Sequence, residues 1–147
     1  MSTLSMSRAE RDAFLAGTHV AILSIADEGR GPLALPVWYR YMPGGDIRIE
    51  TGGTSRKRTL VERAGRATLC VQTETPPYLY VSVEGPTTLD APDFEADTRE
   101  MALRYLGPQM GAAYMEATYP NGLTDQVIVR LRPERWSTAD FRKFGLG

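Results

Sequence analysis

The alternation of apolar and polar positions along the chain predicts a protein built mainly from β-strands. Residues 19–27 are apolar on both faces, which is typical of an interior strand. Residues 32–42 alternate, so one strand is expected there with a shared face of Leu33, Leu35, Val37, Tyr39 and Tyr41. Further strands are expected at 46–51, 67–74, 79–90 and 126–140, the last kinked or ended near Pro133.

Three segments have the spacing and end signals of helices. Ser7, with Glu10 three residues later, forms the pattern of a capping box at the start of a short helix. Glycine is the usual residue just after a helix, and glycine followed by proline interrupts one. The helices are therefore expected from Ser7 to Gly17, from 54 to 64 with Gly65 as its end, and over 93–118 with a break at Gly107-Pro108.

Strands joined mostly by tight turns predict an antiparallel sheet rolled into a small barrel. Only two of the connections contain a helix, whereas a doubly wound parallel fold needs helices between nearly all of its strands. Two apolar faces on the first strand favour closure, because closure removes exposed sheet edges. We therefore expect one mainly β domain over residues 1–147, with six or seven antiparallel strands and helices that cover a barrel end or a subunit seam.

Net charge and cysteine content narrow the functional classes. The formal net charge of -1 gives no global attraction to nucleic acid or to an acidic membrane. A single cysteine, Cys70, excludes an internal disulfide, and no apolar run approaches the roughly 20 residues that span a bilayer. The first residues lack the apolar stretch of a signal peptide. We therefore expect a cytoplasmic protein with neither nucleic-acid nor membrane partners.

The stretch TGGTSRKRTL, residues 51–60, has the composition of an anion-binding turn between a strand and a helix. Thr54 and Ser55 are suited to cap the helix, whose remaining first-turn N–H groups and positive dipole end favour an anion. Arg56, Lys57 and Arg58 oppose that dipole, which is unfavourable unless an anion binds. The stretch therefore predicts a phosphate or carboxylate site. The alternative is a solvated helix face whose arginine stems cover apolar surface.

The front of the chain resembles the flavin/deazaflavin oxidoreductases. The resemblance lies in HVAILSIADEGRGPLALPVWYRYMPGGDIRIETGGTSRKRTLVERAGRATLCVQTE and continues through YVSVEGPTTL. Typical features are a P-V-W-Y-like segment, a following strand, and a basic helix with Lys57, Leu60 and Arg66 at matching positions. These proteins share the split β-barrel of the pyridoxamine 5′-phosphate oxidase superfamily, so the resemblance implies that fold.

The resemblance further implies a homodimer with two cofactor sites at the subunit interface. The cofactor is FMN in some branches and the deazaflavin coenzyme F420 in others, and this sequence is more similar to the F420-using branch of actinobacteria. By position, the phosphate ligands are Thr54, Ser55, Arg56 and Lys57, and Arg58 faces the acidic oligoglutamate tail. Pro36, Val37 and Trp38 lie along the ring, with Thr51 and Gln72 as polar contacts to its edge or to the ribityl chain.

The remaining residues agree with hydride transfer, which needs no acid–base cluster because the cofactor carries the chemistry. His19, the single histidine, opens an apolar strand and is expected to be structural, and Cys70 is expected to be a buried small apolar residue. The sequence has no G-x-S-x-G, G-x-G-x-x-G or P-loop motif, and one histidine with one cysteine makes a zinc or iron site unfavourable. No catalytic side chain and no metal ligand is assigned.

Three functions stay open from the sequence. The first is a reductase that transfers a hydride from reduced F420 to an unsaturated or planar small-molecule substrate, with Tyr78 and Trp136 as candidate substrate contacts. The second is an FMN-dependent oxidoreductase of the same fold. The third is a non-catalytic protein that binds F420, a flavin or, less favourably with one histidine, haem.

Overall fold

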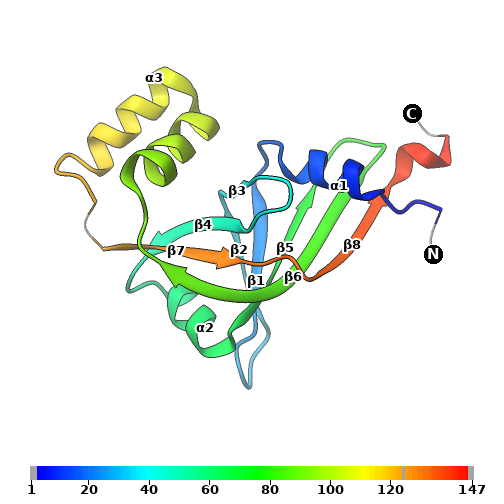
Figure 1. Ribbon diagram of the computed structural model, residues 1–147, viewed down its shortest axis with the longest axis horizontal. Coiled ribbons are helices and arrows are strands. Elements are labelled where there is room, and N and C mark those ends of the chain that lie inside the picture. Colours follow the sequence, from blue (N-terminus) through cyan, green and yellow to red (C-terminus); the bar gives the residue numbers. More distant parts are fainter. Residues whose placement is uncertain (1–2, 124, 146–147) are drawn as a thin grey trace.

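A computed structural model describes residues 3–123 and 125–145. Eight antiparallel strands form one strongly curled sheet, with helices at its ends and along one side (Figure 1). The strands are β1 Ala21–Ile25, β2 Leu33–Val37, β3 Arg40–Tyr41, β4 Ile47–Gly52, β5 Arg66–Gln72, β6 Leu79–Asp90, β7 Gln126–Leu131 and β8 Arg135–Asp140. The helices are α1 Arg8–Leu15, α2 Arg56–Ala64 and α3 Glu100–Thr118, with a π-helical segment η1 Phe94–Arg99 and a 3₁₀ turn η2 Phe141–Phe144.

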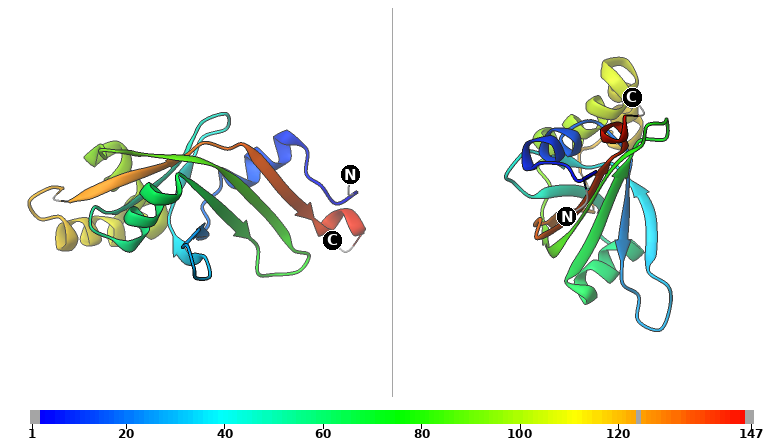
Figure 2. Two further views of the ribbon diagram at one scale, coloured as in Figure 1. Left: turned by 90° about the horizontal axis from the view of Figure 1, so that it is seen from below. Right: turned by 90° about the vertical axis from the view of Figure 1, so that its right-hand side faces the viewer.

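The strand order is β2-β1-β5-β6-β7-β4-β3, and β8 pairs with β6. Figure 2 shows β6 as a long, curved strand that runs through both halves of the sheet. Its residues up to Pro86 pair with β5, and from Thr87 onward they pair with β7. The ladder ends at β2 on one side and at β3 on the other, and these two strands are consecutive in the chain. The expected antiparallel split β-barrel is confirmed.

Two expected strands are each divided, which accounts for eight strands instead of six or seven. The strand expected over 32–42 becomes β2 and β3, which are separated by Trp38 and Tyr39. The strand expected over 126–140 becomes β7 and β8, with Pro133 in the break, as its missing N–H predicts. At this break Gly85 of β6 lies so close to the Arg132 carbonyl that a Cβ atom on it would collide with that oxygen.

The first strand differs from the expectation on one face. Ala21, Leu23 and Ile25 are buried, but Val20 and Ile22 on the other face are 56% and 43% exposed. β1 is interior to the sheet, because it pairs with β2 and β5, yet its outer face has no cover within the described part of the chain. The apolar outer face of β1 therefore does not come from barrel closure.

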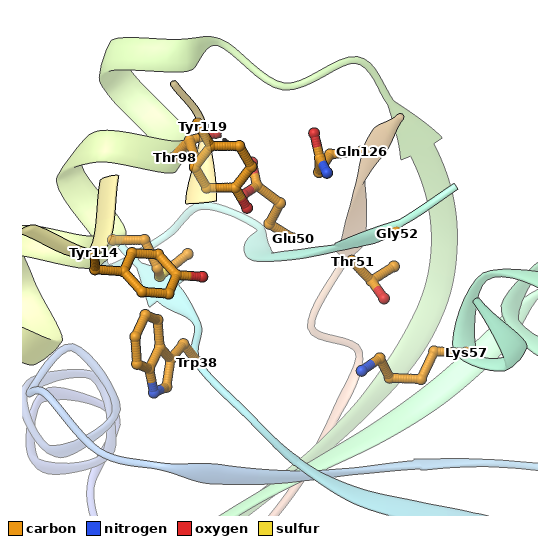
Figure 3. Close-up of a pocket in the computed structure, with 10 residues that line it drawn as sticks. Trp38, Glu50, Thr51, Gly52, Lys57, Thr98, Tyr114, Tyr119 and Gln126 are labelled. Atoms are coloured by element: carbon orange, nitrogen blue, oxygen red, sulfur yellow. Dashed lines mark hydrogen bonds between the residues drawn. The ribbon is translucent and has the colours of Figure 1, made fainter. Parts of the chain in front are cut away.

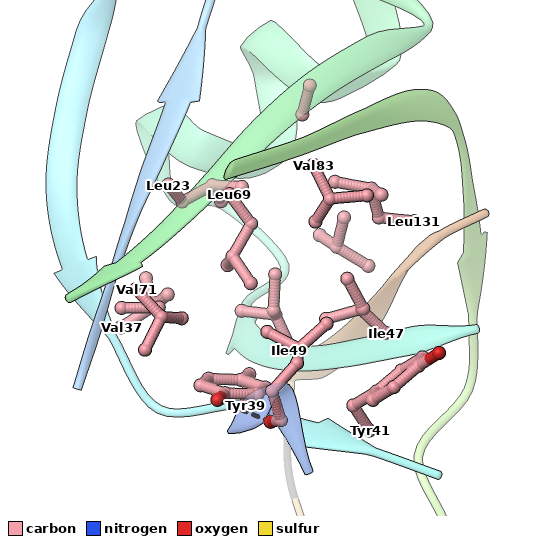
Figure 4. Close-up of a cluster of buried hydrophobic side chains, with 14 of the residues drawn as sticks. Leu23, Val37, Tyr39, Tyr41, Ile47, Ile49, Leu69, Val71, Val83 and Leu131 are labelled. Carbon is pink, nitrogen blue, oxygen red and sulfur yellow. Dashed lines mark hydrogen bonds between the residues drawn. The ribbon is translucent and has the colours of Figure 1, made fainter. Parts of the chain in front are cut away.

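The core lies inside the curl of the sheet (Figure 4). It gathers the inward side chains of nearly every strand, among them Leu23, Val37, Ile49, Leu69, Val71, Val83 and Leu131. Tyr39 is fully buried among them, and its hydroxyl donates to the Leu15 carbonyl at 2.6 Å. This hydrogen bond satisfies the one polar group of the ring and ties the end of α1 to the sheet.

The helix signals are largely confirmed. Ser7 and Glu10 form the capping box, and Gly65 ends α2 with φ 67°. The first helix ends at Leu15, two residues before the expected Gly17. The third helical region is broken at Gly107, where the backbone leaves helical geometry, and it begins as the π-helical η1. None of the helices in the described residues is long and apolar enough to cross a membrane.

Candidate functional site

Two adjoining hollows of about 260 and 440 Å³ form one groove between the sheet and α3. Both are lined by Trp38, Glu50, Lys57 and Tyr114 (Figure 3). The smaller hollow adds Thr51, Gly52, Thr98, Met101, Tyr119 and Gln126, and the larger one adds Val20, Pro36 and Val37. The groove therefore brings together five predicted cofactor residues from three parts of the sequence: Pro36, Val37, Trp38, Thr51 and Lys57.

Trp38 stands in one wall because the chain leaves the sheet between β2 and β3. The backbone N–H of Tyr39, which has no strand partner there, donates to the Tyr105 hydroxyl at 3.0 Å. The same hydroxyl lies 2.6 Å from the His19 carbonyl. The Tyr105 ring stacks on Trp38, with centroids 4.8 Å apart and planes 5° apart. α3 thus holds Trp38 in place and leaves its remaining surface to the groove.

The turn from β4 into α2 forms the floor near Thr51. Ser55 caps α2 by accepting the Arg58 N–H at 3.1 Å, and its hydroxyl lies 3.0 Å from that of Thr51. A Cβ atom at Gly53 would collide with the Asp125 carboxylate, so a larger residue there would displace that side chain. Within the described residues, the N–H groups of Arg56 and Lys57 have no acceptor. Two first-turn donors of α2 are therefore free to bind an anion.

The three consecutive cations of α2 have different surroundings. Arg56 pairs with Asp27 of the β1–β2 loop, and Arg58 pairs with Glu62 one turn later at 2.9 Å. Lys57 has no acidic partner in the part of the chain that the structure describes, and its side chain extends into the groove (Figure 3). The protein itself thus compensates two of these cations, and Lys57 is the member of the triplet whose charge stays unpaired in the groove.

Glu50 lies across the groove from Lys57 and accepts a hydrogen bond from the Thr98 hydroxyl. Burial raises the pKa of Glu50 above its usual value, although the Thr98 hydrogen bond acts in the opposite direction. Burial also raises the pKa of the neighbouring Tyr119, and the nearby Tyr114 and Glu50 add to that shift. The groove therefore combines a free cation at one end with a half-buried carboxyl and two phenols at the other.

Asp97 anchors the helical wall of the groove to the sheet. Its buried carboxylate, 2% exposed, accepts from Arg48 Nε and Nη2 at 2.8 and 2.9 Å and from Arg40 Nη2 at 3.2 Å. Burial alone raises the pKa of Asp97, but the hydrogen bonds from Arg48 and from the Asp93 N–H outweigh it and hold the pKa below its usual value. This contact fixes η1, and with it Thr98, against β3 and β4.

Sequence reasoning missed the helical wall. Glu50, Thr98, Met101, Tyr114 and Tyr119 had no expected role. Alternation along 46–51 places Glu50 and Arg48 on the outer face, so the signal for Glu50 was present. The contacts of the helical residues depend on how η1 and α3 fold back over the sheet, which periodicity does not specify.

The other predicted site residues lie outside the groove lining. Thr54 is exposed, Gln72 is exposed at the end of β5, and Tyr78 is 49% exposed in the β5–β6 connection. Trp136 in β8 makes an edge contact with Tyr41, with centroids 6.3 Å apart, and lies under the Arg11 guanidinium. A single chain therefore does not bring these residues to the groove.

His19 and Cys70 have ordinary structural surroundings. His19 stacks on Phe14, and its Nε2 lies 3.0 Å from the Phe14 carbonyl oxygen. Cys70 lies on the outer face of β5, opposite Ile22, and is half-buried instead of buried as expected. Burial raises the pKa of its thiol. The described residues hold no group of three or more His, Cys, Asp or Glu suited to a metal ion.

No protein-family model and no curated protein matches this sequence. Solved structures match the whole fold. The chain superposes with a TM-score of 0.77 and 24% identity on the conserved hypothetical protein Rv2991 from Mycobacterium tuberculosis, covering 100% of this chain and 92% of that one. It superposes on an F420 reductase with a TM-score of 0.67 and 19% identity, covering 86% and 94%.

A third similar structure is an FAD and haem binding protein from Mycobacterium smegmatis, with a TM-score of 0.71 and 17% identity over 95% of this chain and 73% of that one. These likenesses show a shared fold. The chain has the split β-barrel fold that these structures share, as the resemblance of its front half implied.

Proposed function

We propose that the protein is a split-barrel oxidoreductase that binds a flavin-type cofactor in the groove, and that this cofactor is coenzyme F420. The observation that carries the proposal is the convergence of Trp38, Thr51 and the unpaired Lys57 on one hollow. The F420 reductase of the same fold supports the choice of cofactor.

The residues of the groove suit a ligand with a flat ring and a phosphate. Lys57, the free N–H groups of Arg56 and Lys57, and the Ser55 cap supply donors for an anionic group at the start of α2. Pro36, Val37 and Trp38 supply apolar surface beside it. The donors at one end match the phosphate of F420 or FMN, and the apolar surface along the wall matches the flat ring.

Bound in reduced form, the deazaflavin supplies a hydride to the substrate. The chain's own residues would bind and orient the cofactor. Lys57 would neutralise its phosphate, Trp38 would form the wall beside its ring, and Thr51 would offer a hydroxyl for a hydrogen bond. Glu50 and Tyr119 line the end away from Lys57, where they bound the space left for a planar or unsaturated substrate. Met101 and Tyr114 of α3 form part of the wall at this end.

We further propose that two copies pair through the outer face of β1 and β2. Val20 and Pro36 line the groove and also lie on this exposed apolar face, so the groove opens onto it. A second chain seated there would wall the groove. Tyr78, Gln72 or Trp136 of that chain then become candidate contacts, which would account for their absence from the groove of a single chain.

Titration of the purified protein with F420 and, separately, with FMN tests the cofactor. Saturable binding of F420 with weak or no FMN binding supports the proposal, and tight FMN binding without an F420 response rejects it in favour of an FMN-dependent enzyme. Oxidation of reduced F420 is then measured over a panel of enones and quinones. Binding without any turnover would favour the non-catalytic cofactor-binding protein.

A further inference from the structure

A second pocket, here called the Arg11 pocket, lies at the other end of β4 and shares no lining residue with the groove. It has a volume of about 260 Å³ and is bounded by α1, the β3–β4 turn and the β7–β8 bend. Its lining includes Arg8, Arg11, Asp12, Tyr41, Arg132 and Trp136. Trp136, singled out from the sequence, therefore belongs to this pocket and not to the groove of its own chain.

Positive charge in the Arg11 pocket exceeds the negative charge available to it. Asp46, also in the lining, is engaged by Arg130 at 2.7 Å. Asp12 accepts the Tyr41 hydroxyl at 3.1 Å. Arg132 has no ion pair among the residues that the structure describes.

The contacts of Asp12 with its neighbouring arginines are too long for hydrogen bonds. Its carboxylate oxygens lie 3.9 Å from Arg8 Nε and 3.7 Å from Arg11 Nε. Arg8 and Arg11 thus share one loosely placed carboxylate, and Arg132 adds a third guanidinium group with no ion pair among the described residues. The pocket therefore has positive charge left for a further anion.

Of the three arginines that line the pocket, Arg11 is the one whose side chain is held by packing. Its guanidinium carbon sits 4.1 Å from the centroid of the Trp136 ring, a cation–π contact that fixes the side chain. Its Nε is buried and has no hydrogen-bond acceptor within the described part of the chain. A buried donor without an acceptor is unfavourable, so the protein does not itself saturate the hydrogen-bonding capacity of this guanidinium. The Arg11 side chain is 25% exposed as a whole, which leaves its remaining N–H groups available to an oxyanion in the pocket.

We propose that the Arg11 pocket binds the phosphate or carboxylate group of a small molecule, with Arg11 as the fixed ligand and Arg132 and Arg8 at its rim. The guanidinium fork suits the planar pairs of oxygens that both groups present. This site is separate from the cofactor groove, and its occupation does not depend on the function proposed above.

The chain has two tryptophans, one in the groove and one in the Arg11 pocket, so ligand binding at each can be followed separately by tryptophan fluorescence. In a Trp38→Phe protein the remaining indole is Trp136, beside Arg11. Inorganic phosphate and succinate are titrated separately against sodium chloride at matched ionic strength, and the emission of Trp136 is followed. A saturable change with one of the two anions, absent with chloride, is expected, and the stronger response identifies the group.

Arg11→Met keeps an apolar stem against Trp136 and removes the charge, so it should weaken anion binding about tenfold or more. Arg135→Met is the matched control, because Arg135 is 78% exposed, pairs loosely with Glu84 and lies outside the pocket lining. It should leave anion affinity unchanged. No saturable response, or equal affinity in folded Arg11→Met, overturns the proposal.

If Arg11→Met does not fold, the exposed Arg132→Met decides instead, and unchanged affinity in that variant overturns the site. Cofactor binding is followed independently through Trp38 in a Trp136→Phe protein. Failure of the Arg11 pocket and failure of the proposed function are therefore distinguished.

Discussion

The Trp38 indole and the Tyr105 ring lie 4.8 Å apart and within 5° of parallel, although 67 positions separate them in the sequence. The Tyr105 hydroxyl also accepts the Tyr39 N–H where the chain passes from β2 to β3. One α3 side chain thus completes the backbone hydrogen bonding of the sheet and sets the wall of the groove.

Replacing Tyr105 by phenylalanine should keep the stack and leave the Tyr39 N–H without its acceptor. The free energy of unfolding is expected to fall by about 1–3 kcal/mol, the usual cost of a buried unpaired donor. Urea denaturation measures the change. Tyr78→Phe, which removes a hydroxyl from an exposed ring, is the control and should have little effect; equal stabilities of the two variants would contradict the role of the hydroxyl.

Reversal of charge at Lys57 should weaken cofactor binding. Lys57→Glu places a carboxylate beside the proposed phosphate, and at least about a tenfold loss of F420 affinity is expected, because a charge-assisted hydrogen bond is replaced by repulsion. Calorimetry measures the affinity. Lys143→Glu makes the same charge reversal outside the groove lining, at a lysine that pairs with Glu10, and a folded protein with this change should bind F420 normally. Unchanged affinity in a folded Lys57→Glu protein removes Lys57 from the site.

Asp97→Asn should loosen the attachment of η1 to the sheet. The change removes the carboxylate that Arg40 and Arg48 both contact and leaves Arg48 only its longer, 3.9 Å contact with Asp90, so a loss of about 3 kcal/mol in unfolding free energy is expected. Asp90→Asn, at a more exposed ion pair, should cost about 1 kcal/mol or less. Because the pKa of Asp97 is lowered in the folded state, its contribution is present above about pH 4 and is lost as the pH falls through the folded pKa. A difference between wild type and Asp97→Asn that is constant with pH would refute this.

Glu50 should have the opposite pH dependence, because its pKa is raised by burial. The folded protein then holds this proton more tightly than the unfolded chain, so ionisation of Glu50 costs stability as the pH rises from about 4 through the folded pKa. Glu50→Gln cannot ionise, and its stability relative to wild type should increase over that interval. Urea denaturation at a series of pH values tests this, with Glu116→Gln on the exposed side of α3 as the charge control.

Gly85→Ala should be strongly destabilising. A Cβ atom there would lie 1.7 Å from the Arg132 carbonyl oxygen, so β6 and the β7–β8 bend must move apart. A loss of about 3 kcal/mol or more is expected. Gly31→Ala is the control, because a Cβ atom at Gly31 meets nothing within 4 Å, and its stability should stay within about 0.5 kcal/mol of wild type. Similar thermal midpoints for the two variants would show that the bend adapts.

Sequence patterns predicted the features that depend on neighbouring residues. Alternation located the strands, Pro133 located a break, and Gly65 ended α2 as expected. The division at Trp38 and Tyr39 was missed, because the alternation continues unbroken through both residues while the hydrogen bonds pass to Tyr105. Local sequence patterns also gave no sign that Arg56 pairs with Asp27, 29 positions away. All three cations were therefore expected at the site, whereas Lys57 alone of the triplet lines the groove.

β6 belongs to both halves of the split barrel, pairing with β5 and β8 in its first part and with β7 in its second. If either half unfolded, β6 would lose hydrogen-bonded strand partners while it still belonged to the other half. Such sharing makes partial opening costly and couples the loss of the groove to the loss of the core, so the molecule is built to come apart as one cooperative unit.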